Sequence, residues 1–140
     1  MNLIDRLAHT VAAEIHRGSL GRLVWIRVHA SVSSDAPHLP LLRSLLQVVL
    51  GWFNRPPRSF VKIGDLASRT MVVIQFEHGE GALVALATAS DEKSARFLVE
   101  VLGDRGAVSF RLPEGEEDWQ LEPLPEEQTQ EASRLLQQAN

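Results

Sequence analysis

A series of short runs rich in apolar and β-branched residues begins at Ser59, and it constrains the fold more than any other feature of the chain. The runs are SFVKIG, RTMVVIQFE, GALVALATAS, ARFLVEVLG, GAVSFRL and, more weakly, DWQLEPL. Runs of this length and composition are typical of β-strands. The segments EHGEG and GDRG between them contain the glycines that tight reversals need. The sequence therefore predicts an antiparallel meander from residue 59 onward.

Helical periodicity frames this β-rich region on both sides. Apolar residues from Leu3 to Ile15 recur at intervals of three and four, which predicts an amphipathic helix that stops at Gly18. The run RLVWIRVHASV predicts a strand, and PLLRSLLQVVLGWF predicts a second helix that ends at Gly51 before the prolines of NRPP. PEEQTQEASRLLQQA predicts a terminal helix. Residues 1–140 should form one α+β domain, with an open, mainly antiparallel sheet of five to six strands and two to three helices packed on one face.

Composition limits the classes of function. The chain has 140 residues, a net charge of -4 and scattered basic residues, so we expect one folded domain that does not bind nucleic acid. It has no cysteine, which fits a reducing compartment. No apolar run is long enough to span a bilayer, and charged residues interrupt the N-terminal segment where a signal peptide would be apolar. These observations predict a cytoplasmic protein with no membrane partner.

Two of the predicted strands are apolar at nearly every position. MVVIQF and ALVALA leave few polar residues that could solvate a free face of the sheet. A sheet that is apolar on both sides needs cover on both sides, so we predict a homodimer or other homo-oligomer formed through one sheet face. The predicted interface residues are Val72, Ile74, Phe76, Leu83 and Ala85.

Asp35 and His38 stand three residues apart before the second predicted helix. Asp35 precedes Ala36 and Pro37, a position that suits a helix N-cap. His38 is the one candidate for proton transfer, because an imidazole has an unperturbed pKa of about 6.5. A lone histidine beside a proline is more often an incidental surface residue, so His38 is a weak candidate.

The order of these elements resembles the C-terminal domain of the Gfo/Idh/MocA oxidoreductases. The similarity lies in a GSLG turn into the first strand, an aspartate before a strand that ends near F-x-x-x-x-G-A, and a late G-x-x-G turn. The residues concerned are Gly18, Leu20, Gly21, Asp65, Phe76, Gly81, Ala82, Gly103 and Gly106. The resemblance implies a substrate-binding and oligomerisation domain whose sheet face forms a subunit interface.

The chain also departs from that family. The G-x-G-x-x-G turn of a dinucleotide-binding unit is missing, because GSLG follows a helix and precedes a strand. The family's E-K-P lysine motif is absent as well. The family pattern D-x-x-x-H-x-x-D is one residue short here, and Leu41 stands where the family has an acid. We therefore expect no bound nicotinamide cofactor and no hydride transfer by this chain alone.

Other candidate sites lack the partners that their chemistry requires. The remaining histidines form no metal-ligand pattern with acids, the serines have no activating histidine, and the acids after Pro113 do not follow the EF-hand register. The three tryptophans suit core or interface anchors better than a base-stacking platform. The residues are His9, His16, His29 and His78; Ser33, Ser34, Ser90 and Ser94; Glu114, Glu116, Glu117 and Asp118; and Trp25, Trp52 and Trp119.

Three functions remain open. The first is a stand-alone, non-catalytic domain that acts in oligomerisation, binding or regulation. The second is the substrate-domain subunit of a split NAD(P)-dependent sugar or cyclitol dehydrogenase, in which His38 and Lys62 would face a nicotinamide held by a separate dinucleotide-binding chain. The third is a small-metabolite binding protein with a pocket between helices and sheet.

Overall fold

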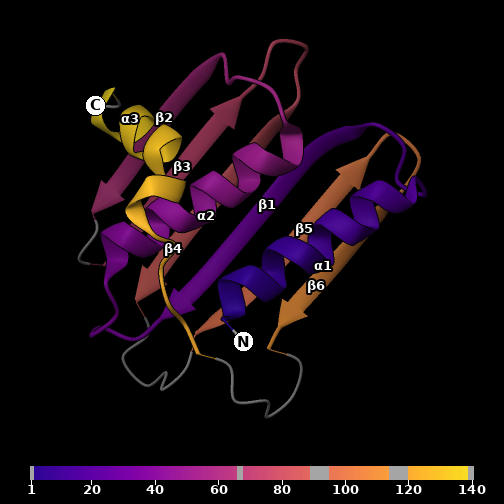
Figure 1. The fold of residues 1–140 in the computed structure, drawn as a ribbon. Helices are drawn as coiled ribbons and strands as arrows, with labels where there is room; N and C mark the ends of the chain where they lie inside the picture. The colour runs from indigo at the N-terminus through magenta and orange to yellow at the C-terminus, as the bar shows by residue number, and fades with distance from the viewer. Residues whose placement is uncertain (1, 66–67, 89–94, 114–119, 139–140) are drawn as a thin grey trace.

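The three α-helices of the described residues lie on one face of a six-stranded sheet (Figure 1). This computed structural model describes residues 2–65, 68–88, 95–113 and 120–138. The elements are α1 (Leu3–Arg17), β1 (Leu23–Val32), α2 (His38–Phe53), β2 (Ser59–Asp65), β3 (Arg69–Gln75), β4 (Gly81–Thr88), β5 (Arg96–Gly103), β6 (Ala107–Leu112), the 3₁₀ turn η1 (Glu126–Gln128) and α3 (Gln130–Gln138). The predicted α+β class, with an open sheet and helices on one face, is confirmed.

Strand β1 lies inside the sheet, and this arrangement corrects the predicted meander. The strand order is β2-β3-β4-β1-β5-β6, with β1 parallel to β4 and the other neighbours antiparallel. Strands β2, β3 and β4 are joined by hairpins, and so are β5 and β6, but β5 pairs with β1 instead of β4 and interrupts the meander. A parallel pair requires a long crossover, and here α2, β2 and β3 supply it between β1 and β4.

The first two helices end at residues with left-handed backbone conformation. Gly18 terminates α1 as predicted, with φ of 86° and its N–H donating to the Ile15 carbonyl. Helix α2 continues past Gly51 to Phe53 and is capped by Asn54, with φ of 53°, so the predicted end at Gly51 is wrong. The Phe53 ring stacks on Phe76 at a centroid distance of 4.3 Å, and this contact holds the last turn against the sheet.

The core fills the space between the helices and the sheet. Alternate positions of the strands point into it, and Val72, Ile74 and Phe76 are at most 2% exposed there. The prediction that these three residues form an intermolecular interface is therefore wrong, because they are already covered within the chain. The face of β3 that lacks helical cover instead carries Met71 and Val73. No helix among the described residues combines the length and the apolar character that a membrane crossing requires.

The C-terminal segment closes the helical layer. Gln120 forms an isolated bridge with Asn2, which is the extent of regular pairing in the described part of the weakly predicted strand DWQLEPL. The Leu124 N–H then donates to Ser44 Oγ at 2.8 Å, and the Ala132 N–H donates to the side chain of Gln47 at 3.3 Å. Helix α3 therefore packs on α2 of its own chain, and the predicted terminal helix is present (Figure 1).

Candidate functional site

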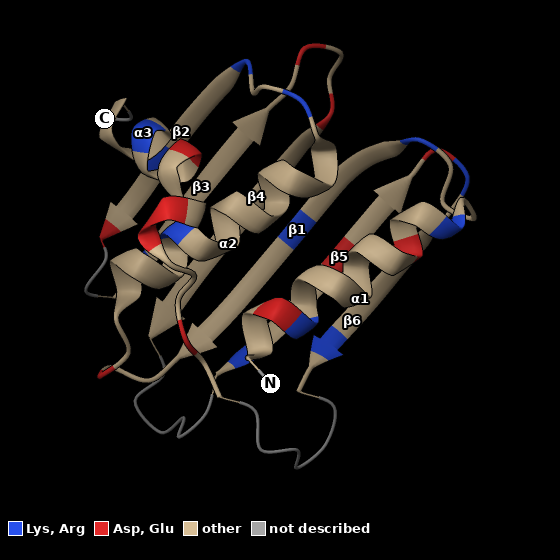
Figure 2. Ribbon diagram, viewed as in Figure 1, with Lys and Arg blue, Asp and Glu red and all other residues tan. Residues whose placement is uncertain are grey.

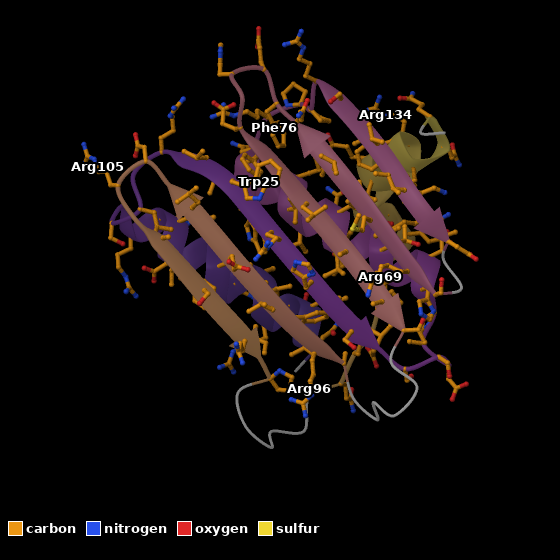
Figure 3. All side chains as sticks on the ribbon, turned by 180° about the vertical axis from the view of Figure 1, so that it is seen from behind. Trp25, Arg69, Phe76, Arg96, Arg105 and Arg134 are labelled. Atoms are coloured by element: carbon orange, nitrogen blue, oxygen red, sulfur yellow. The ribbon has the colours of Figure 1, made fainter. Side chains whose placement is uncertain are left out.

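The sheet face opposite the helices, here called the open face, is ordered by strand register into rows of side chains (Figure 3). The two central rows cross all six strands from β2 to β6. They consist of Val61, Val73, Leu83, Arg27, Glu100 and Ser109, and of Ile63, Met71, Ala85, His29, Leu98 and Arg111. Apolar residues therefore gather on β2, β3 and β4, while charged residues stand on β1, β5 and β6.

We call the six residues Val61, Val73, Leu83, Ile63, Met71 and Ala85 the apolar half-face. Val61 and Ile63 are each 50% exposed, and the side chains inward from them are partly buried by their neighbours. Leu83 and Ala85, two of the five predicted interface residues, belong to this surface. The other three, Val72, Ile74 and Phe76, point to the helix-covered side instead.

An ion pair adjoins the apolar half-face. In Figure 2, a basic segment of β1 and an acidic segment of β5 lie side by side in the middle of the sheet. Arg27 on β1 donates from Nε to Glu100 Oε1 on β5 at 3.0 Å, and its Nη2 contacts the same oxygen. Both side chains are a little over 40% exposed. Trp25 lies above Gly81 in the adjacent row, where an added Cβ would approach its ring to 2.4 Å. The indole packing therefore depends on the absence of a side chain at Gly81.

One end of the open face is hollowed and basic. A cavity of about 610 Å³ lies over the ends of β1 and β4, with a floor that includes Ser31, Ala85 and Ala87. Arg69, Arg96 and Arg111 also line it, from β3, β5 and β6. Sequence reasoning missed these arginines, because they are far apart in the chain and only the strand order brings them together.

His38 is the first residue of α2 and contacts the end of β4. Its Nε2 lies 2.8 Å from Thr88 Oγ1, and the Thr88 N–H donates to the Ser68 carbonyl at 3.0 Å. Within the described residues, no hydrogen bond from the imidazole to a carboxylate is present. The hydroxyl partner holds the ring in place at the start of α2.

The predicted capping role of Asp35 is wrong. The N-cap position of α2 is occupied by Pro37, and no side chain caps the helix. Asp35 is exposed in the preceding turn, where the Ala36 N–H donates to the Ser33 carbonyl at 3.1 Å. With Pro37 as the N-cap, α2 begins two residues later than a cap at Asp35 would require.

The other predicted sites remain scattered. Lys62 sits on edge strand β2 on the helix-covered side, opposite Val72, and the described residues show no hydrogen bond between it and His38. His9 Nδ1 donates to the Asp5 carbonyl at 2.8 Å within α1. In the described ranges no three His, Cys, Asp or Glu residues are grouped as metal ligands. Ser90, Ser94, Trp119 and the acids Glu114, Glu116, Glu117 and Asp118 lie outside the described residues.

A buried carboxylate at the β3–β4 turn was also missed. Glu80 is 2% exposed, and its oxygens contact Arg22 at 3.2 Å and Arg55 at 3.3 Å. Its Oε2 also accepts from the His78 N–H at 3.3 Å. The contacts join the segment after α1, the segment after α2 and the turn before β4, so this cluster fixes one corner of the fold.

Sequence comparison alone gives no relatives. A scan against protein-family profiles finds no match, and no curated protein matches the chain significantly. Comparison of the fold gives a different result, because many solved structures share it.

Dehydrogenases are among the similar structures. A probable dehydrogenase from Thermotoga maritima matches with a TM-score of 0.61 and 11% identity, over 92% of this chain and 48% of its own. Myo-inositol 2-dehydrogenase from Lactobacillus plantarum matches with a TM-score of 0.61 and 11% identity, over 83% of this chain and 41% of its own. For scyllo-inositol dehydrogenase from Lactobacillus casei, solved with NAD(H) and scyllo-inositol, the values are 0.59 and 12%, over 96% and 52%.

The chain thus spans about half the length of the dehydrogenases it matches. The matched half is their C-terminal region, as the resemblance in the sequence implied. At these identities the likeness concerns the fold, and it says nothing of shared activity. The fold of this chain is that of the C-terminal domain of Gfo/Idh/MocA-type dehydrogenases.

Proposed function

We propose that this chain is a non-catalytic, self-associating domain that pairs with a second copy through its open face and serves binding or regulation. The observation that carries the proposal is the apolar half-face. Six apolar side chains on three adjacent strands have no helix above them, although the opposite sides of β3 and β4 are buried under the helices. A surface of this kind marks an interaction site.

The size of the open face suits a stable pair. Strands about 4.8 Å apart make a six-stranded sheet about 24 Å wide, and strands of six to ten residues are about 20 to 33 Å long. The area of a face with this width and length is comparable to the roughly 800 Å² that each partner contributes to a standard interface. In a two-fold pair the same patch meets its own copy, so apolar surface is matched with apolar surface.

The Arg27–Glu100 pair is compatible with burial in such an interface. Each charge already has its partner within the chain, so association would not leave an isolated charge in an apolar contact. Its position beside the half-face also favours one orientation of the two copies, since a shifted pairing would place these charges against valine and leucine.

The mass of the protein in solution tests the proposal. Light scattering after size-exclusion chromatography at micromolar concentration should give twice the 15.5 kDa of one chain. Val73→Lys places a charge between Val61 and Leu83 in the central row, and it should give the monomer mass. Gln137→Lys adds the same charge to an exposed position of α3 and should leave the dimer intact.

Circular dichroism of each variant must show the parent fold before the masses are compared. A parent protein that is a monodisperse monomer would refute self-association. Val61→Lys gives a second test at a half-exposed edge position, where a lysine side chain reaches solvent without disturbing the core.

The second candidate is the substrate-domain subunit of a split NAD(P)-dependent dehydrogenase. It is favoured by the position of His38, which lies at the N-terminus of α2 and whose imidazole contacts Thr88 at the end of β4. The structural match to about half of each dehydrogenase chain supports it too, because a separate chain would have to supply the nucleotide domain.

Co-expression with a dinucleotide-binding chain encoded by an adjoining gene tests this candidate. NADH formation from inositols that is lost with His38→Gln, while the complex still assembles, would establish it in place of the non-catalytic function. Without that partner, we expect calorimetry to detect no useful binding of NAD or NADP, because the glycine turn that approaches a pyrophosphate is missing from the sequence.

A further inference from the structure

We infer that the hollow at the end of the open face binds a small organic anion, in which a carboxylate or phosphate is joined to an apolar body. The inference concerns a cavity within one chain and goes beyond self-association. It begins with the floor, where small residues leave space. Ala87 on β4 pairs with Ser31 on β1, and Ala85 pairs with His29 one row away, so that four adjacent positions provide an apolar base with one hydroxyl and one imidazole.

Guanidinium groups flank this floor within the same two rows. Arg69 pairs with Ala87 from one side, and Arg96 pairs with Ser31 from the other. Their Cα atoms are separated by three strand spacings, which is about 14 Å, and small residues occupy the interval. Arginine side chains are long enough that Arg69 and Arg96 can both contact a molecule bound between them.

A second arginine strengthens the β5 side. Arg111 on β6 stands opposite Leu98, so it is the diagonal neighbour of Arg96 at about 7 to 8 Å. From backbone positions this close, two long arginine side chains can reach the same carboxylate or phosphate, with which arginine forms bidentate hydrogen bonds. Arg96 already has an interaction within the chain, and the five donors of a guanidinium allow it to bind a ligand as well.

The local charge opposes the charge of the whole chain. Three arginines line the cavity, whereas the protein carries a net charge of -4. Asp65 on β2 is the strand partner of Arg69 and places a negative charge at that end of the row. The anionic group of the ligand is therefore expected at the other end, beside Arg96 and Arg111. Met71 and the two alanines then contact the apolar body at the other end. In Figure 3, the labelled side chains of Arg69 and Arg96 lie at the same end of the sheet.

Two fluorescent probes separate charge from apolar contact. 8-Anilinonaphthalene-1-sulfonate carries one anionic group on an aromatic body, and N-phenyl-1-naphthylamine is its neutral counterpart. The double variant Arg96→Gln/Arg111→Gln should raise the Kd of the sulfonate by about tenfold, the loss expected for one charge-assisted contact, and leave the Kd of the neutral probe nearly unchanged. Ala87→Leu fills the floor and should weaken binding of both probes.

Arg105→Gln is the matched control, because it removes an exposed arginine from the β5–β6 turn at the far end of the sheet (Figure 3). It should change either Kd by less than about twofold, as expected for a distant exposed charge. Inorganic phosphate should compete only weakly with the sulfonate. Equal competition by phosphate, or equal losses from Arg105→Gln and the double variant, would overturn the proposed site.

Repeating the titration with Val73→Lys separates this inference from self-association. Val73 does not line the cavity, so the variant should bind the sulfonate whether or not the parent protein is a dimer. Binding by the variant and not by the parent would support the site and show that the second copy closes it. Absence of arginine-dependent binding in both proteins would overturn the inference and leave the mass measurement as the independent test of dimerisation.

Discussion

The two faces of strand β3 contain residues of the same kind in opposite surroundings. Val72 and Ile74 are fully buried under the helices, whereas Val73, between them, points to the open face and is only partly covered. An apolar side chain contributes to the stability of one chain only where that chain covers it. The comparison teaches that one apolar strand can have one set of alternate residues buried in the core of its chain and the other set left at the surface.

Alanine substitutions at the adjacent residues Val72 and Val73 should give the largest difference in stability between the two faces. Val72→Ala should lower the free energy of unfolding by about 2 to 3 kcal/mol, because it removes two buried carbon atoms and leaves a cavity. Val73→Ala should cost about 1 kcal/mol or less in the monomer, since its side chain already contacts water. Urea unfolding followed by circular dichroism, at a concentration where the protein is monomeric, measures both.

Equal losses at the two positions would show that the open face is covered within the chain or between copies under those conditions. A dependence of the Val73→Ala effect on protein concentration identifies the second case, because association stabilises the folded state by mass action. Val72→Ala should show the same loss at every concentration.

The two ion pairs extend the comparison to charged groups. Glu80→Gln should lower the free energy of unfolding by about 1 to 2 kcal/mol, because the carboxylate is 2% exposed and accepts hydrogen bonds from charged donors. The loss stays below the 3 to 5 kcal/mol typical of broken buried pairs, since Arg22 and Arg55 reach solvent. Glu100→Gln, at the exposed pair with Arg27, should cost about 0 to 1 kcal/mol.

Salt provides the check on this second comparison. The effect of Glu100→Gln should fade as sodium chloride rises towards 1 M, where the screening length falls to about 3 Å. The effect of Glu80→Gln should persist, because solvent ions do not enter the buried corner. A Glu100→Gln loss as large as that of Glu80→Gln would mean that the open face is not solvated.

The sequence predicted local features of this fold well and non-local ones poorly. The end of α1 at Gly18 follows from the residue itself, because glycine readily adopts positive φ. The end of α2 depends on the stacking of Phe53 on Phe76, residues 23 positions apart, so Gly51 was an incomplete signal. The placement of β1 between β4 and β5 likewise depends on pairing between distant segments, which periodicity does not reveal.

The candidate sites divide in the same way. The four central residues of β3, MVVI, are all apolar and show no alternation, so they did not reveal which residues face the helices. The basic hollow requires the strand order before Arg69, Arg96 and Arg111 can be grouped. His38 was found from sequence because a histidine at a helix start stands out, but its partner Thr88 is 50 residues away.

The smallest expected effect concerns Asp35 and His38, where the structure reverses the order that the sequence suggested. A capping aspartate would make Asp35→Ala cost about 0.5 to 2 kcal/mol and His38→Ala little. Because Pro37 holds the cap position and Asp35 is exposed, Asp35→Ala should now change stability by no more than about 0.5 kcal/mol. His38→Ala should cost about 0.5 to 1.5 kcal/mol, the usual contribution of the hydrogen bond it loses to Thr88.

Thr88→Val is the matched partner change, and the double variant should cost less than the sum of the two single losses, because both remove the same bond. Additive losses would mean that the imidazole and the hydroxyl stabilise the chain separately, and a larger loss from Asp35→Ala than from His38→Ala would restore the aspartate as the cap of α2.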